Sequence, residues 1–120
     1  MPEVSIVTYS KSSIWLIGLR TLSQLGGVSI VSEAASLAGA LQSVQAHRPQ
    51  ALVGNADDLT FEFLEHLRGQ MPGLKVVVIE GDARSPESRF EGRLVDIYLR
   101  RSISVEGLRD AILAQMAKVA

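Results

Sequence analysis

Polar residues stand directly after four short apolar segments of the chain, where side chains could do chemistry. They are Ser10-Lys11, Asn55, Glu80 and Arg101. This set contains no nucleophile with a neighbouring base and no pair of carboxylates for a metal ion. We therefore expect no catalysis, no metal site and no cofactor at these positions.

Three further sets of polar residues carry weaker signals. Ser10-Lys11-Ser12 is similar to part of a phosphate-binding loop but lacks its glycines, which disfavours nucleotide binding. Asp57 and Asp58 could be proposed as displaced phosphoacceptors, but Asp is a preferred helix N-cap, so we expect Asp58 to cap the next helix. His47 and His66 have no ligand-like companion, and we expect both at the surface.

The elements that must position these residues follow from apolar patterning. Short β-branched segments predict strands at Val4–Tyr9, Val28–Ser32, Ala51–Val53, Lys75–Ile79 and Leu94–Leu99. Helical spacing and caps predict helices at Ile14–Leu25, from Leu37 to before Pro49, after Asp58, near Glu87–Gly92 and after Ser104. Continuous apolar strands that alternate with amphipathic helices favour a parallel sheet covered on both faces, within one domain over residues 1–120.

Several stretches in this order resemble response-regulator receiver domains, in particular those of LuxR-type transcription regulators. The resemblance spans Val4 to about Ala117 and is carried by Ile14–Arg20, Val31–Ala34, Arg48–Val53 and Tyr98–Ser102, with a loop about three residues short after Asn55. It implies an α/β, doubly wound three-layer sandwich with strand order 2-1-3-4-5. Independently of the resemblance, a parallel sheet of this kind leads us to expect ligand or partner chemistry at the carboxyl ends of the strands.

The resemblance further implies that the phosphorylation pocket is degenerate. The acidic pair, the phosphate-accepting aspartate, the hydroxyl residue and the lysine of the family fall on Ser10, Lys11, Asn55, Glu80 and Arg101. A carboxamide cannot form an acyl phosphate, and a hydroxyl beside an ammonium group is a poor site for Mg²⁺. Tyr98 matches the aromatic switch position without its usual hydroxyl partner.

Two interpretations of this altered pocket stay open. Lys11 and Arg101 could flank Glu80 in an internal ion cluster, with Asn55 hydrogen-bonded into it, and so hold one fixed conformation. Alternatively, these are solvated loop residues whose ion pairs contribute little.

Apolar residues on the first predicted helix suggest a second surface. Trp15, Leu16 and Ile17 follow Ile14 without interruption, which covers more than one helix face. The resemblance places Leu16 and Ile17 where relatives commonly carry charge. We expect a dimer or partner interface at Trp15, Leu16, Ile17, Leu113, Ala114 and Ala117, with a tightly packed monomer core as the alternative.

Composition limits the partners. Twelve Lys and Arg balance thirteen Asp and Glu, so nothing in the net charge recruits nucleic acid. The absence of cysteine, of a signal-like N-terminus and of a membrane-length apolar run leads us to expect a cytoplasmic chain that spans no membrane.

These observations favour a phosphorylation-independent pseudo-receiver in signal transduction. It would act through a homodimer or a partner protein and would control transcription through a DNA-binding domain outside these residues. The alternative is a sensor of small anionic metabolites at Ser10, Lys11, Asn55 and Arg101.

Overall fold

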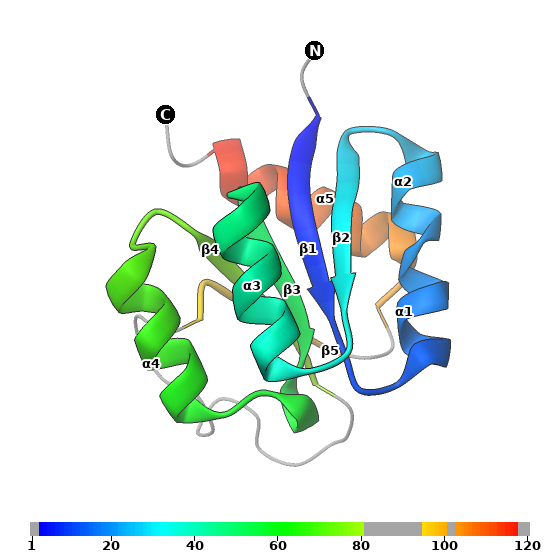
Figure 1. Cartoon of the computed structure of the whole chain (residues 1–120). Helices are drawn as coiled ribbons and strands as arrows, with labels where there is room; N and C mark the ends of the chain where they lie inside the picture. Colours follow the sequence, from blue (N-terminus) through cyan, green and yellow to red (C-terminus); the bar gives the residue numbers. More distant parts are fainter. Residues whose placement is uncertain (1–2, 81–94, 101–102, 118–120) are drawn as a thin grey trace.

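Five parallel strands form the centre of the protein (Figure 1). The computed structural model describes residues 3–80, 95–100 and 103–117. The sheet has the order β2-β1-β3-β4-β5, with bounds Val4–Tyr9 (β1), Val28–Ala34 (β2), Ala51–Asn55 (β3), Lys75–Glu80 (β4) and Ile97–Arg100 (β5). The predicted fold class and strand order are therefore confirmed.

Helices cover both faces of the sheet (Figure 1). Their bounds are Ser13–Leu19 (α1), Thr21–Leu25 (α2), Leu37–His47 (α3), Phe61–Gln70 (α4) and Val105–Ala117 (α5), with a 3₁₀ turn, η1, at Ala56–Asp58. Helices α3 and α4 bury Val44 and Leu64 against one face. Helices α1, α2 and α5 bury Leu19, Leu22 and Ile112 against the other. Because successive strand residues point to opposite faces, each apolar strand supplies both cores.

Local signals explain where the helices begin and end. The hydroxyl of Ser12 caps α1 by accepting from the N–H of Trp15, and Gly26 ends α2 at φ 85°, a conformation that glycine adopts readily. Helix α3 ends because Arg48 takes a left-handed φ of 46° ahead of Pro49. These boundaries position the loops at both edges of the sheet.

Three sequence predictions need correction or lie outside the described residues. The predicted first helix is divided at Arg20, whose N–H donates to the carbonyl of Ile17, three residues back. Asp58 does not cap α4, because it belongs to η1 and Thr60 accepts from the N–H of Phe63 instead. The helix predicted near Glu87–Gly92 lies outside the ranges that the structure describes.

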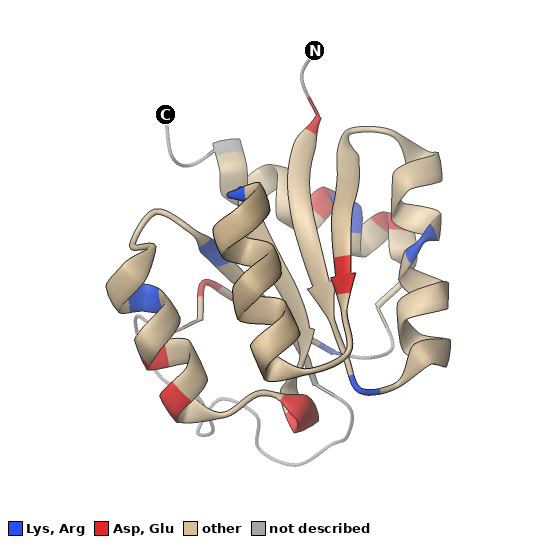
Figure 2. Cartoon of the chain, in the orientation of Figure 1, with Lys and Arg blue, Asp and Glu red and all other residues tan. Residues whose placement is uncertain are grey.

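Charge is spread over the molecule rather than concentrated. Figure 2 shows acidic and basic residues interspersed on the helices and at the strand ends, in keeping with the formal net charge of −1. Within the described ranges, no helix combines the length and the apolar character needed to cross a bilayer.

Candidate regulatory crevice at the carboxyl ends of the strands

The carboxyl ends of β1 and β3 lie next to each other and place Ser10 and Asn55 together at the site where the sequence predicts a crevice, and we keep that name for this site. Tyr9 pairs with Gly54 in the sheet, so the residue after each lies at the same edge. The side chains are almost inaccessible, since Ser10 is 0% and Asn55 is 8% exposed. The two positions that the resemblance assigned to metal and phosphoryl binding are therefore buried and neutral.

Asp58 supplies a carboxylate to this site. Its Oδ2 accepts a hydrogen bond of 3.0 Å from the Ser10 hydroxyl and another of 3.0 Å from the backbone N–H of Lys11. Its backbone carbonyl accepts a 2.9 Å bond from the Tyr9 hydroxyl. Burial raises the pKa of the Tyr9 phenol, and the charge of Asp58 raises that pKa further. Asp58 thus joins the end of β1 to the loop after β3 by side chain and backbone together.

Asn55 stabilises the same loop with its side chain. Its side-chain oxygen accepts a 3.1 Å hydrogen bond from the N–H of Asp57 and so caps η1. Along the described segments, no three His, Asp or Glu side chains gather as a metal ion would require. The observed role of Asn55 is thus to cap η1, while its predicted part in an ion cluster stays a prediction.

The other predicted crevice residues are only partly placed. Lys11 is exposed, and its ammonium group has no ion pair with any described residue. The backbone of Glu80 ends β4, but its side chain and the whole of Arg101 lie outside the described residues, so the ion cluster stays a hypothesis. Tyr98 is half-buried against the core beneath α3 and α4.

Sequence reasoning missed the role of Asp58, although one signal pointed to it. The loop after Asn55 is short relative to the family pattern, and in the structure it folds into η1. Since Thr60 stands directly before α4 and supplies a good cap, the carboxylate of Asp58 was not needed there. The short turn instead returns Asp58 to the end of β1.

The predicted interface on α1 is partly wrong. Leu16 is only 7% exposed and packs inward, as does Leu19 three residues later. The projecting residues are Ile14 and Ile17, which are 81% and 56% exposed. Residues three apart share a helix face, so Ile14 replaces Leu16 as the outward apolar residue beside Ile17.

Other residues of α1 line an apolar hollow. It has a volume of about 270 Å³ and lies between α1 and the beginning of α5, lined mainly by Trp15, Leu19, Ile79, Ile103, Val105 and Leu108. Two of the α5 residues predicted for the interface, Leu113 and Ala114, do not line this hollow. Leu113 packs partly against the core, and Ala114 is exposed. The side chain of Ala117 is outside the described set.

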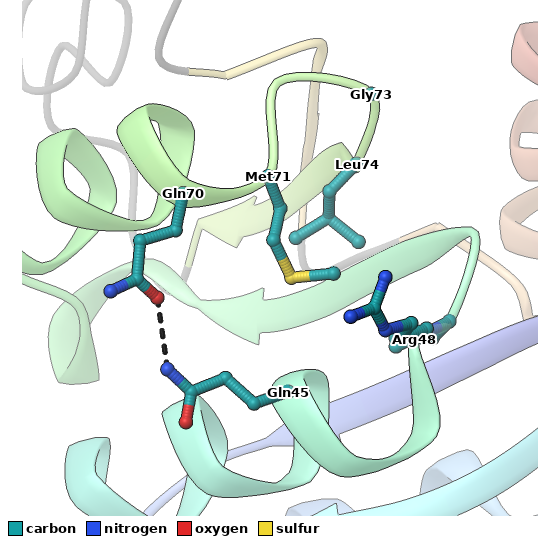
Figure 3. Close-up of a pocket in the computed structure, with 7 residues that line it drawn as sticks. Gln45, Arg48, Gln70, Met71, Gly73 and Leu74 are labelled. Carbon is teal, nitrogen blue, oxygen red and sulfur yellow. Dashed lines mark hydrogen bonds between the residues drawn. The ribbon is translucent and has the colours of Figure 1, made fainter.

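A larger hollow lies at the other end of the strands from Ser10 and Asn55, near the C-termini of α3 and α4. Its volume is about 590 Å³, and Gln45, Arg48, Pro49, Gln70, Met71, Gly73 and Leu74 line it. Figure 3 shows the amide of Gln45 reaching Gln70 across it, at 2.9 Å. Two helix C-termini place partial negative charge here, which favours a cation such as Arg48 over an added anion.

Comparisons with known proteins agree with this geometry. Neither a protein-family model nor a curated protein matches the sequence. Among solved structures, the receiver domain of a response regulator, AraT, from Geobacillus stearothermophilus matches with TM-score 0.82 and 20% identity over 98% of this chain and 96% of that one. The signal receiver domain of the putative response regulator NarL from Mycobacterium tuberculosis matches with TM-score 0.81 and 20% identity over 95% and 96%.

A third solved structure is a longer protein. It contains two RcsB dimers bound to two parallel DNAs and matches with TM-score 0.78 and 13% identity over 97% of this chain and 65% of that one. All three likenesses extend over nearly the whole of this chain, and the strand order is the one expected for the family. The chain therefore has the fold of response-regulator receiver domains.

Proposed function

We propose that this chain is a regulatory receiver domain that works without phosphorylation, through contact with a second copy of itself or with a partner protein. The observation that carries the proposal is that the crevice positions Ser10 and Asn55 hold neutral side chains already engaged in hydrogen bonds. Asn55 stands at the phosphoacceptor position as a buried amide that caps η1, and Ser10 is a buried hydroxyl bonded to Asp58. Neither group can take a phosphoryl group from a small donor in the manner of a receiver aspartate.

Magnesium chemistry is disfavoured for a separate reason. Mg²⁺ is held by carboxylate oxygens in near-octahedral geometry. Ser10 and Lys11 supply none, and the Asp58 Oδ2 already accepts two hydrogen bonds. Without the metal, a transferring phosphoryl group would lack the divalent cation that offsets its charge and aligns it with the acceptor.

The test is labelling with acetyl phosphate and Mg²⁺, read by intact-mass spectrometry. We expect no phosphorylated species for the parent chain. The variant Asn55→Asp restores a carboxylate at the phosphoacceptor position and should also stay unlabelled, since the metal-binding pair is still missing. Labelling of the parent at Asp57 or Asp58 would overturn the proposal.

The contact surface we propose is the apolar face of α1. Ile14 and Ile17 project from the same helix that contributes Trp15 and Leu19 to the 270 Å³ hollow. A two-fold dimer needs one patch that is complementary to itself, and α1 carries both projecting apolar side chains and the wall of an apolar hollow that could receive them. We infer that the isoleucines of one copy fill the hollow of the other.

Solution mass tests this surface. Ile17→Glu and Ile14→Glu should shift the chain from dimer to monomer, because a carboxylate in an apolar interface is left unpaired. Phe61→Glu is a matched control, since Phe61 is 52% exposed but lies on α4, across the sheet. A dimer that persists in both isoleucine variants would exclude the α1 face. Leu16→Glu is unsuitable, because Leu16 is buried within the monomer.

A role in transcription would need a DNA-binding element besides residues 1–120. The RcsB structure contains dimers bound to DNA, and this chain matches 65% of the RcsB chain. We propose that a fused or partner domain supplies DNA contact here as well. Loss of promoter binding by the whole regulator in Ile17→Glu, with binding retained in Phe61→Glu, would support this arrangement.

Metabolite sensing in the crevice is the second candidate function, and the geometry favours it less. The Ser10 hydroxyl and the Lys11 N–H would be natural donors to an anion, but both donate to Asp58. An incoming anion would also meet the charge of that carboxylate. Thermal shift against a panel of anionic metabolites discriminates the two functions, with a stabilising hit that Lys11→Met abolishes favouring the sensor.

A further inference from the structure

A continuous series of hydrogen bonds runs from the crevice into α1. The carboxylate of Asp58 accepts from Ser10, and the Ser10 hydroxyl oxygen in turn accepts a 3.0 Å bond from the N–H of Ser12. The Ser12 hydroxyl then accepts a 3.3 Å bond from the N–H of Trp15, which is its N-cap bond. One carboxylate therefore connects to the first turn of α1 through two serine hydroxyls.

Both ends of this series are anchored. At the crevice end, the Tyr9 hydroxyl donates a hydrogen bond to the backbone carbonyl of Asp58. The backbone N–H of Ser10 donates a 3.2 Å hydrogen bond to the carbonyl of Ala34 in β2. At the other end, Trp15 and Leu19 line the hollow between α1 and α5. A change at Asp58 can therefore alter the position of α1 through these hydrogen bonds.

The charge of Asp58 makes this path stronger than neutral hydrogen bonds would. Bonds to a carboxylate are roughly twice as strong as neutral ones. A hydroxyl that donates to a charged acceptor becomes a better acceptor itself, so the Ser12 N–H bond to Ser10 gains as well. Losing the charge weakens the Ser10 bond to Asp58 and, through the Ser10 hydroxyl, the bond from the Ser12 N–H. The position of Ser12, whose hydroxyl caps α1, is then less firmly held.

We propose that Asp58 is an internal latch that fixes the first turn of α1, and with it the hollow lined by Trp15, from inside the crevice. The Asp58 carboxylate, through Ser10 and Ser12, would link the conformation of the crevice to that of the α1 surface without a bound metal or phosphoryl group. This inference goes beyond the proposed function and does not depend on it, since the latch would operate in a monomer and whether or not the chain accepts a phosphoryl group.

The single tryptophan of the chain gives a direct readout. Trp15 is the only Trp among the 120 residues, so its emission maximum and its quenching by acrylamide report on the first turn of α1. Hydrogen exchange of the Lys11, Ser12 and Trp15 amides reports on the donors of the series. We expect Asp58→Ala to speed their exchange at least tenfold and to shift Trp15 emission to the red, with a smaller effect in Asp58→Asn.

The matched control is Asp57→Asn, which changes the same charge one residue away in η1 without removing a member of the series. It should leave Trp15 emission and these amides near parental values. The measurements are repeated in the Ile17→Glu background, so that association cannot move Trp15.

Two results would overturn the latch. One is Asp58→Ala with parental exchange at Lys11, Ser12 and Trp15. The other is acceleration that extends equally to α3 amides such as Ala40, because Asp58 would then support the whole fold rather than α1. Ser10→Ala keeps the test decisive if Asp58→Ala unfolds, since it removes the middle of the series and leaves the carboxylate bonded to Lys11. These readouts use neither acetyl phosphate labelling nor the solution mass of the dimer. The latch and the proposed function can therefore fail separately.

Discussion

The hydroxyl of Tyr9 donates a 2.9 Å hydrogen bond to the backbone carbonyl of Asp58, a residue 49 positions further along the chain. The ring of Tyr9 is fully buried in the core beneath α3 and α4 and packs near Phe63, with ring centroids 6.5 Å apart. The last residue of β1 therefore positions the loop after β3 by a buried polar bond. This bond holds the backbone of the same residue whose carboxylate accepts from Ser10 and Lys11.

Replacement of Tyr9 by Phe should lower the free energy of unfolding by about 1–2 kcal/mol, the cost of leaving a part-buried carbonyl without its donor. The ring is kept, so the core should not open a cavity. Urea unfolding of Tyr9→Phe beside the parent measures the difference. An unchanged midpoint would mean that water replaces the hydroxyl at no cost.

The same pair predicts a loss of stability at high pH. The pKa of Tyr9 is raised in the folded state, first by burial and then by Asp58. Above about pH 10 the unfolded chain releases the tyrosine proton before the folded chain does, so the free energy of unfolding falls as pH rises. The advantage of the parent over Tyr9→Phe should therefore be full near neutral pH and shrink above about pH 10. A difference that stays constant across that range would contradict this assignment.

Part of this architecture could be read from residue pattern alone. The strand predicted at Val4–Tyr9 has those bounds in the structure, because a β-branched segment there meets a serine cluster that can cap a helix. The strand predicted from Leu94 instead begins at Ile97. Its predecessor Asp96 uses a side-chain oxygen, at 2.7 Å, to accept the Val76 N–H, which a strand carbonyl would otherwise take.

The details of the site were harder to predict because they depend on tertiary contacts. Whether an aspartate after β3 caps a helix or returns to β1 is decided by where the chain next turns, and the N-cap preference alone does not contain that information. Helical spacing could have corrected the surface prediction. Leu16 and Leu19 share one face and Ile14 and Ile17 another, so only one pair can point into the core.

Glycine substitution should separate backbone strain from helix propensity. Gly27 has φ 88°, and an added Cβ would lie 3.2 Å from the Leu113 Cδ1. Gly27→Ala should therefore destabilise the fold by about 1–2 kcal/mol. Gly69→Ala is the control, since nothing lies within 4 Å of its added Cβ in α4, and it should stabilise by about 0.5 kcal/mol. Thermal unfolding with opposite shifts for the two variants is the expected outcome.

The ion pair of Arg68 with Asp96 should matter more than the other described pairs. Both side chains are largely buried, and Arg68 also donates to the Leu74 carbonyl while Asp96 accepts from Val76. Arg68→Met should cost about 3 kcal/mol, because it leaves a largely buried carboxylate without its cation. Glu33→Gln breaks the more exposed pair with Arg20 and should change stability much less. Equal losses in the two variants, measured by urea unfolding, would rule out burial as the reason.

A buried hydroxyl in β1 offers a substitution that should stabilise the protein. Thr8 is fully buried between β2 and β3, and among the described residues its Oγ1 has no hydrogen-bond partner. Burying a hydroxyl without a partner costs about 1–3 kcal/mol, and valine has nearly the same shape without that group. Thr8→Val should therefore raise the free energy of unfolding by about 1 kcal/mol. Thr8→Ala is the matched control, since it also removes the hydroxyl but loses a methyl group of packing and should gain less or lose stability. A destabilised Thr8→Val would show that the hydroxyl is bonded in solution, to water or to a part of the chain beyond the described residues.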